Sequence, residues 1–306
     1  MSTEPVSQPR KKITIHTLRE KKMRGEPITF LTAYDYPTAV AMDRAGMDGI
    51  LVGDSLGMVE LGYETTLPVT MQDMLHHCRA VSRGVRSAHL VGDLPFLSYQ
   101  ASVSEAMRNA GRLMQKGGMD AVKLEGGRDR VPAIRAMVSA GIPVMGHLGL
   151  TPQSVHQLGG WKVQGKSVQA AKEIIEDALI LEDAGCYSVV LEAIPVEVAH
   201  LITNRLSIPV IGIGAGIGCD GQVLVVHDVL GMFDRFTPSF VKKYADLFSE
   251  MERAFQEYIR DVRERTFPGA EHAHSMDPQA LRDLVREMEI QGFDFEPGES
   301  QPERFH

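Results

Sequence analysis

AGMDGILVGD, residues 45–54, and GGMDAVKLEGG, residues 117–127, are two copies of the pattern that decides the fold. Each copy ends a helical stretch on a glycine, where a helix C-terminus favours a left-handed residue, and continues as a short apolar strand. SAGIPVMGH (139–147) and DAGCYSVVLEA (183–193) follow the same plan. A repeated unit of helix, glycine and strand predicts alternating helices and strands, which is typical of parallel sheets.

Eight segments of the chain fit the strand part of this unit. Several of them are continuous apolar runs, as expected for parallel strands that helices cover on their outer face. Eight strands alternating with helices over about 240 residues favour a (β/α)8 TIM barrel, with a doubly wound open sheet as the alternative. The predicted strands are 28–34, 48–53, 88–93, 120–125, 142–147, 187–192, 208–213 and 222–228.

Capping residues mark where the helices between these strands begin. Predicted helices cover 71–84, 103–116, 130–139, 168–183, the segment from Pro195 at the first helical position to about 204, and 238–266. The first two should open with capping boxes and the next two with single N-caps. These are Thr70 with Asp73, Ser102 with Glu105, Asp129, and Ser167.

The elements divide the chain into a flexible N-terminal tail (1–12), a barrel that forms the catalytic domain (13–268) and a polar C-terminal extension (269–306). Thr17 and Glu20 form a predicted capping box for a short helix before the first strand. The extension should carry one amphipathic helix near 278–290, be partly disordered, and have disordered residues over its last ten positions.

Composition excludes several classes of protein. A net charge of −8 and a pI near 5.8 argue against a nucleic-acid surface. No run approaches the roughly 20 apolar residues of a membrane span, and the polar start MSTEPVSQPRKK does not resemble a signal peptide. The three cysteines are scattered, which fits a reducing cytoplasm rather than a disulfide framework or a thiolate zinc site.

Polar residues stand at the carboxyl ends of nearly all the predicted strands. Barrel enzymes place their chemistry at this end, so we expect these side chains to gather at one mouth. Tyr34 and His147 are expected near the site without an assigned role. The full set is Tyr34 with Asp35, Asp54 with Ser55, Asp93, Lys123 with Glu125, His147, Glu192, and His227 with Asp228.

Four carboxylates at one mouth need more positive charge than one lysine provides. Lys123 and Glu125 are two positions apart, so both should project to the same side of their strand. A divalent cation would relieve the repulsion, and Mg²⁺ suits a set that offers carboxylates and no thiolates. The four are Asp54, Asp93, Glu125 and Glu192.

Each of these residues also has a structural interpretation. Asp54 could cap the following turn, Asp93 could serve turn chemistry before Leu-Pro, and His147 could be a hydrogen-bonded core histidine. GIGAGIGCDGQ (212–222) contains GxGxxG, but a strand rather than a helix is predicted to follow it. We therefore interpret it as a loop that approaches substrate closely, with a phosphate cradle as the alternative.

Longer motifs resemble one enzyme family closely. LTAYDYPTAVAMDRAGMDGILVGDSLGMVELGYETTLPVTMQDM is similar to the opening of the ketopantoate hydroxymethyltransferases. So are GDLPF, VKLEGG, GHLGLTPQS, LGGWKVQGK, LEAIP and IGIGAG…CDGQVLVVHDVLG, in consistent order from about residue 13 to 268. The tail from 269 has no counterpart in this resemblance.

The resemblance implies a Mg²⁺-dependent barrel enzyme of pantothenate and coenzyme A synthesis, assembled as a homodecamer. It would transfer a one-carbon unit from methylenetetrahydrofolate to 3-methyl-2-oxobutanoate and release 2-dehydropantoate. The residues that match the family's site are Asp54, Asp93 and Glu125 for Mg²⁺, Asp54, Ser55, Asp93 and Lys123 for the keto acid, and Glu192 as proton acceptor.

Two other functions fit the same chemistry. A Mg²⁺-dependent lyase or mutase of the phosphoenolpyruvate mutase and isocitrate lyase type would also stabilise an enolate. A non-catalytic barrel that binds keto acids would need the same carboxylates. Turnover that depends on folate separates the main interpretation from both.

Overall fold

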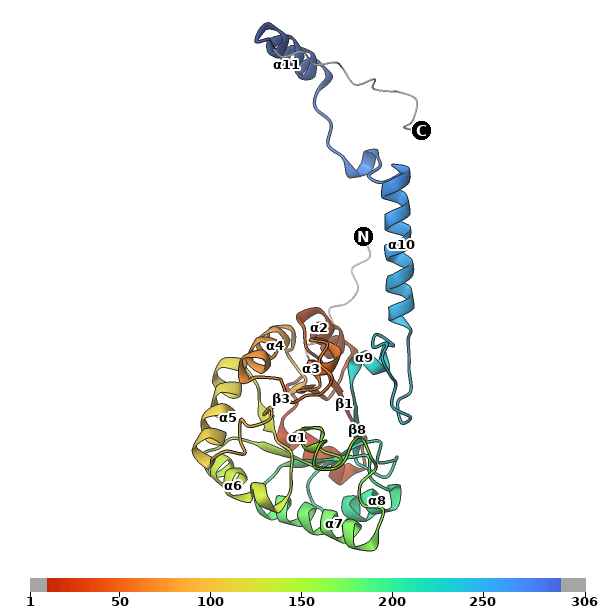
Figure 1. Ribbon diagram of the computed structural model, residues 1–306. Helices are drawn as coiled ribbons and strands as arrows, with labels where there is room; N and C mark the ends of the chain where they lie inside the picture. The colour runs from red at the N-terminus through yellow and green to blue at the C-terminus, as the bar shows by residue number, and fades with distance from the viewer. Residues whose placement is uncertain (1–9, 293–306) are drawn as a thin grey trace. The chain divides into compact units, whose positions relative to one another are not determined.

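The computed structural model describes residues 10–292, and its strands close into a barrel of eight parallel strands in sequence order (Figure 1). Every strand pairs with its neighbours in the chain, and β1 also pairs with β8, so the (β/α)8 prediction is confirmed and the open sheet is excluded. The strands are β1 Ile28–Thr32, β2 Gly49–Val52, β3 His89–Asp93, β4 Ala121–Lys123, β5 Val144–Gly149, β6 Ser188–Glu192, β7 Val210–Ile213 and β8 Gly221–Leu224.

Helices surround the barrel, as Figure 1 shows for α4 to α8. Between β7 and β8 the described chain forms only the glycine-rich loop, and the strand that follows it confirms that GxGxxG here is not a dinucleotide fingerprint. The helices of this unit are α1 Ile15–Arg24, α2 Tyr36–Ala45, α3 Leu56–Val59, α4 Met71–Gly84, α5 Val103–Gly117, α6 Val131–Ser139, α7 Val168–Asp183, α8 Val196–Arg205 and α9 Val226–Val229.

Apolar side chains form two cores, one inside the barrel and one between the strands and the helices. Phe30, Leu51 and Val190 belong to the inner core, and Leu18 of α1 joins it at the amino end of the strands. Alternate residues of the strands face these two cores, so most strands are buried on both faces, although Thr29 of β1 and Gln222 of β8 are exposed. This explains the continuous apolar runs in the sequence.

Several predicted helix starts are confirmed and others are wrong. Thr70 with Asp73 forms a reciprocal capping box for α4, and Ser167 caps α7. Ser102 accepts from the Glu105 N–H at the start of α5, but the Glu105 side chain does not complete the predicted box. The prediction for Asp129 is wrong, because it lies in the 3₁₀ turn Arg128–Arg130 before α6. Pro195 is the N-cap residue of α8, one position before the predicted place.

The first helix begins earlier than Thr17 and Glu20 predicted. Thr14 is the N-cap residue of α1, and Thr17, at the third helical position, completes the capping box with it. Residues 1–9 of the predicted tail lie outside the described residues. Lys12 Nζ donates to the Ala88 carbonyl at 2.7 Å and pairs with Asp120 at 2.6 Å, so the end of that segment is held against the barrel.

The chain divides into two compact units at residue 245, and the second is described only up to 292. It contains α10 Leu247–Glu264, the short turn Ala270–His272 and α11 Pro278–Ile290. The helix near 278–290 is confirmed, whereas the predicted helix over 238–266 begins only at Leu247. The predicted disorder of the last ten residues falls outside the described residues. None of the helices described is both long and apolar enough to cross a membrane.

Candidate active site

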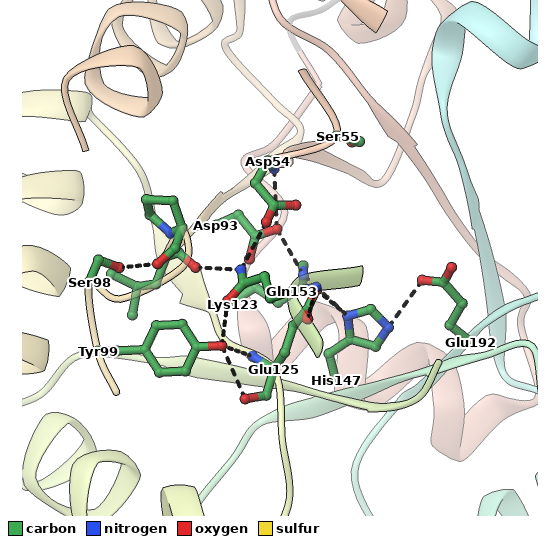
Figure 2. Close-up of polar contacts among 12 residues, drawn as sticks. Asp54, Ser55, Asp93, Ser98, Tyr99, Lys123, Glu125, His147, Gln153 and Glu192 are labelled. Carbon is green, nitrogen blue, oxygen red and sulfur yellow. Dashed lines mark hydrogen bonds and ion pairs between the residues drawn. The ribbon is translucent and has the colours of Figure 1, made fainter. Parts of the chain in front are cut away.

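The polar residues that end the strands meet at the carboxyl mouth of the barrel, as predicted (Figure 2). Together they line one cavity of about 350 Å³, a volume in the range of small-molecule sites. All except Ser55 and Glu192 are nearly inaccessible to solvent. The residues brought together are Asp54, Ser55, Asp93, Lys123, Glu125, His147 and Glu192.

Lys123 is the buried cation of this cluster. Its Nζ donates to Asp93 Oδ2 at 2.9 Å and lies 3.4 Å from His147 Nδ1. Burial lowers the pKa of Lys123, but the charge of Asp93, followed by those of Glu125 and Asp54, raises it above its usual value overall. The lysine is therefore protonated, which suits ion pairing and opposes a role as an amine nucleophile.

The carboxylates carry more negative charge than their surroundings balance. Burial and the charges of Asp93 and Glu125 raise the pKa of Asp54 well above its usual value, and burial also raises the pKa of Asp93. Burial acts to raise the pKa of Glu125 too, but its 3.5 Å contact with His147 and the His147 charge lower it overall. A bound cation would reduce the net negative charge and stabilise the charged forms of these carboxylates.

Two buried oxygens of the cluster lack a hydrogen-bond partner within residues 10–292: Asp93 Oδ1 and Glu125 Oε1. Oxygens of this kind are what Mg²⁺ prefers as ligands. In the described residues, no three histidine, cysteine or acidic side chains lie close enough together to form a metal site. The carboxylates would therefore have to move closer together to bind one ion. Glu125 Oε1 instead lies 3.5 Å from His147 Nδ1.

Glu192 approaches the cluster from the opposite side of the His147 ring (Figure 2). Its Oε2 lies 3.1 Å from His147 Nε2, an ion-pair approach rather than a well-directed hydrogen bond. Burial and the Lys123 charge lower the pKa of His147, but its contacts with Glu125 and Glu192 raise it to about 9 overall. His147 is thus a charged residue between two carboxylates, not an isolated core histidine.

The backbone fixes where Glu192 stands. Ala193, the next residue, has a φ of 46°, in the left-handed region that residues other than glycine rarely adopt. Its N–H donates to the Ile213 carbonyl at 2.9 Å, and the Glu192 carbonyl accepts from Leu150 N–H at 2.8 Å. Strain held by surrounding hydrogen bonds is typical of functional sites.

Sequence reasoning missed Gln153 and Tyr99, which hold the carboxylates. Gln153 Nε2 donates to Asp54 Oδ2 at 2.8 Å, and its N–H donates to Glu125 Oε2 at 3.0 Å. The Tyr99 hydroxyl donates to Gln153 Oε1 at 2.7 Å and accepts from Glu125 N–H at 3.1 Å. Gln153 lies in GHLGLTPQS, so its motif was visible, but an uncharged residue after a strand gave no chemical signal.

Tyr34 supports Ser55 and does not line the cavity itself. Their hydroxyl oxygens lie 2.8 Å apart, and burial raises the pKa of Tyr34, so its phenol stays protonated. Asp35 is an N-cap of α2, where its carboxylate accepts from Thr38 N–H at 2.8 Å. Asp35 therefore has a structural role as a helix cap.

The prediction that the eighth strand ends at His227 and Asp228 is wrong. β8 stops at Leu224, and His227 and Asp228 lie on α9 instead. β1 pairs with β8 only as far as Leu31 and Leu224, so the strand has no partner beyond that point. Thr32 Oγ1 accepts from Val226 N–H at 3.0 Å, which turns the chain into the short helix.

Residues 12–270 match the family described as ketopantoate hydroxymethyltransferase. The chain is 60% identical over 263 residues to the 3-methyl-2-oxobutanoate hydroxymethyltransferase of Syntrophus aciditrophicus (strain SB), covering 86% of this chain and 97% of the relative. It is 56% identical over 273 residues to the enzyme of the same name from Enterococcus faecalis (strain ATCC 700802 / V583), covering 89% and 99%.

Solved structures with low sequence identity share the fold. A phosphoenolpyruvate phosphomutase from Streptomyces platensis subsp. rosaceus superposes with a TM-score of 0.56 at 17% identity, covering 91% of this chain and 97% of that one. A 2,3-dimethylmalate lyase gives 0.53 at 16% identity, covering 91% and 97%. At these identities the likeness concerns the barrel alone.

Proposed function

Since the chain belongs to the ketopantoate hydroxymethyltransferase family, we propose that it transfers a one-carbon unit from methylenetetrahydrofolate to 3-methyl-2-oxobutanoate, giving 2-dehydropantoate. The observation that carries this proposal is the buried cluster of Asp54, Asp93, Glu125 and Lys123 at the barrel mouth, with Glu192 facing it. Such a cluster suits a small anionic keto acid whose C3 proton must be removed.

The donor set fits Mg²⁺, which Asp54, Asp93 and Glu125 would hold. Their ligands are all oxygens, and two of these oxygens are buried without partners in the described structure. Burial is the main cause of the raised pKa values of Asp54 and Asp93, and a bound cation would favour the charged form of both carboxylates. When bound, Mg²⁺ would supply positive charge where the enolate oxygen develops.

Lys123 and Ser55 would orient the keto acid. The protonated Lys123 would offset the charge of the substrate carboxylate, and Ser55, held by Tyr34, would offer a hydrogen-bonding hydroxyl. Burial strengthens these interactions, because little water competes with them. Asp54 and Asp93 border the same space, so they would contact the keto acid as well.

Glu192 would take the C3 proton. It stands on β6, across the His147 ring from the lysine, and its main chain is fixed by the bonds on either side. His147 would keep the carboxylate oriented through the 3.1 Å contact. The carbanion formed at C3 would then form the new C–C bond to the methylene carbon of the folate. Both C–N bonds to that carbon must break, so that tetrahydrofolate leaves protonated on nitrogen and water supplies the hydroxyl oxygen of 2-dehydropantoate.

Purified protein incubated with 3-methyl-2-oxobutanoate, methylenetetrahydrofolate and Mg²⁺ should produce 2-dehydropantoate, detectable by mass spectrometry. In deuterated water the keto acid alone should exchange its C3 proton. A lyase or mutase would show enolate chemistry with no folate-dependent product, and a keto-acid-binding barrel would show neither reaction. Either pattern would overturn the proposal.

Two finer features belong to the same proposal. The resemblance to the family supports a homo-oligomer, a homodecamer in particular, which light scattering on the purified protein would test. The three cysteines are free, which favours the reducing cytoplasm as its compartment.

A further inference from the structure

Asp228 is a buried carboxylate that the proposed chemistry does not use. It is 8% exposed, lies on α9 and lines the same cavity as Asp54 and Glu192. Within residues 10–292 no hydrogen bond or ion pair reaches its carboxylate oxygens, and the Lys243 charge acts on it only through space. The side chain is largely covered, but its oxygens are not fully enclosed, so they stay open to the cavity, where a ligand with hydrogen-bond donors can pair with them.

The lining of this cavity includes aromatic side chains as well as charged ones. Trp161, Phe233, Phe236 and Phe240 line the same cavity as Asp228, and Phe233 and Phe236 meet edge to face with ring centroids 5.7 Å apart. Trp161, Phe236 and Phe240 also remain partly exposed to solvent. Flat aromatic walls open to solvent suit a planar ring that enters from outside.

The backbone makes room for one of these rings. A Cβ at Gly214 would lie 2.7 Å from Phe240 Cδ1, so the ring occupies space that a larger residue would fill. Gly214 has a φ of +63°, which also favours glycine. The loop that carries the other two phenylalanines is held by Arg235, whose guanidinium donates to the Gly62 carbonyl at 2.9 Å.

The cavity therefore combines a buried charged cluster, partly exposed aromatic side chains and one further carboxylate, Asp228, that has no partner in the described residues. The pyrimidine ring of a tetrahydropterin is planar, and its N3–H and 2-amino groups form two parallel donors on one edge. Two parallel donors match the two oxygens of a carboxylate, the geometry of the strongest side-chain hydrogen-bond pairs. The keto acid is small and anionic, so neither the aromatic side chains nor the additional carboxylate would contribute to its binding.

We propose that Asp228 binds the N3–H and 2-amino edge of the pterin ring of the one-carbon donor, with Trp161 and Phe240 against the ring. This inference rests on the proposed function and deepens it, because it identifies the residue that selects the folate. Burial, which raises the pKa of Asp228 to about 6, still leaves the group ionised at neutral pH.

Trp161 is the single tryptophan of the chain and lines the cavity, so tryptophan fluorescence reports on a ligand bound beside it. Tetrahydrofolate titrated into the Mg²⁺-loaded enzyme should change that fluorescence. Asp228→Asn keeps the size of the side chain but presents a donor to one of the two pterin donors. We expect it to weaken tetrahydrofolate binding by about 10- to 100-fold and to raise KM for methylenetetrahydrofolate similarly.

A matched control is Asp183→Asn, because Asp183 lies on the outer helix α7 with its side chain 75% exposed. It should bind tetrahydrofolate as the wild type does. Exchange of the C3 proton in deuterated water, with no folate present, shows whether the keto-acid end stays assembled in each variant. Unchanged folate affinity and KM in Asp228→Asn would overturn the inference.

A tetrahydrofolate analogue with a methyl group in place of the 2-amino group tests the assignment without relying on one variant. The wild type should bind this analogue at least about 10-fold more weakly than tetrahydrofolate, whereas Asp228→Asn should discriminate between them little. Equal binding by the wild type would refute the inference even if the variant failed to fold. A wild type that neither binds tetrahydrofolate nor forms product would instead refute the proposed function, and this inference with it.

Discussion

Replacing Lys123 with methionine tests how much the buried lysine stabilises the carboxylates around it. Lys123 is 4% exposed and Asp93 is 1% exposed, with 2.9 Å between the charged atoms. Removing one member of a buried ion pair costs roughly 3–5 kcal/mol, because the other charge stays buried and unpaired. At about 2–4 °C per kcal/mol for a unit of this size, the melting temperature should fall by roughly 6–20 °C.

Thermal and urea unfolding followed by circular dichroism, with EDTA present, would measure this loss. Lys172→Met is the control, because Lys172 is 67% exposed and lies 3.7 Å from Glu176 on α7. An exposed pair of this kind contributes less than about 1 kcal/mol. Mg²⁺ should restore part of the stability of Lys123→Met by supplying positive charge to the same carboxylates.

The reasoning fails if Lys123→Met and Lys172→Met melt together in EDTA. That result would mean that the carboxylates take up protons or separate without a significant cost. Failure of Mg²⁺ to stabilise Lys123→Met, with wild type stabilised normally, would show that the lysine arranges the ligands rather than merely balancing their charge.

Three further predictions concern single residues. Glu192→Gln should abolish C3 exchange in deuterated water yet still bind the keto acid with Mg²⁺ by calorimetry; undiminished exchange would remove Glu192 from the proton step. Asp93→Asn should lose calorimetric Mg²⁺ binding in the presence of keto acid, and unchanged binding would contradict its role as a ligand. His89, whose Nε2 lies 3.0 Å from the Tyr187 hydroxyl, is buried, and burial lowers its pKa to about 4. The unfolded chain therefore takes up this proton first, so the stability of the wild type should fall by up to about 1.4 kcal/mol per pH unit between pH 6.5 and 4. His89→Gln should lack this contribution in urea unfolding, and an unchanged pH slope would show that His89 does not titrate in this way.

The sequence determined the barrel and the charged part of its mouth. Short apolar runs, several of them after helix-ending glycines, predicted all eight strands, because a parallel strand covered on both faces is apolar at most of its positions. Asp54, Asp93 and Lys123 could be placed together for a related reason, since the carboxyl ends of parallel strands in a closed barrel meet at one mouth.

Tertiary structure decided the conformation of segments whose local sequence pattern predicts a strand or a helix that the neighbouring segments do not support. The valine-rich run after Gly221 favours a strand, but the neighbouring strand has ended, so Val226 N–H donates to Thr32 Oγ1 and α9 begins at Val226. The segment from Pro238 likewise reads as a helix, yet Phe240 lies against Gly214 and lines the cavity instead. Gln153 could not be assigned because its role lies in distances to two carboxylates far away in the chain. Periodicity records which side of an element is buried, whereas contacts between distant segments exist only once the barrel has closed.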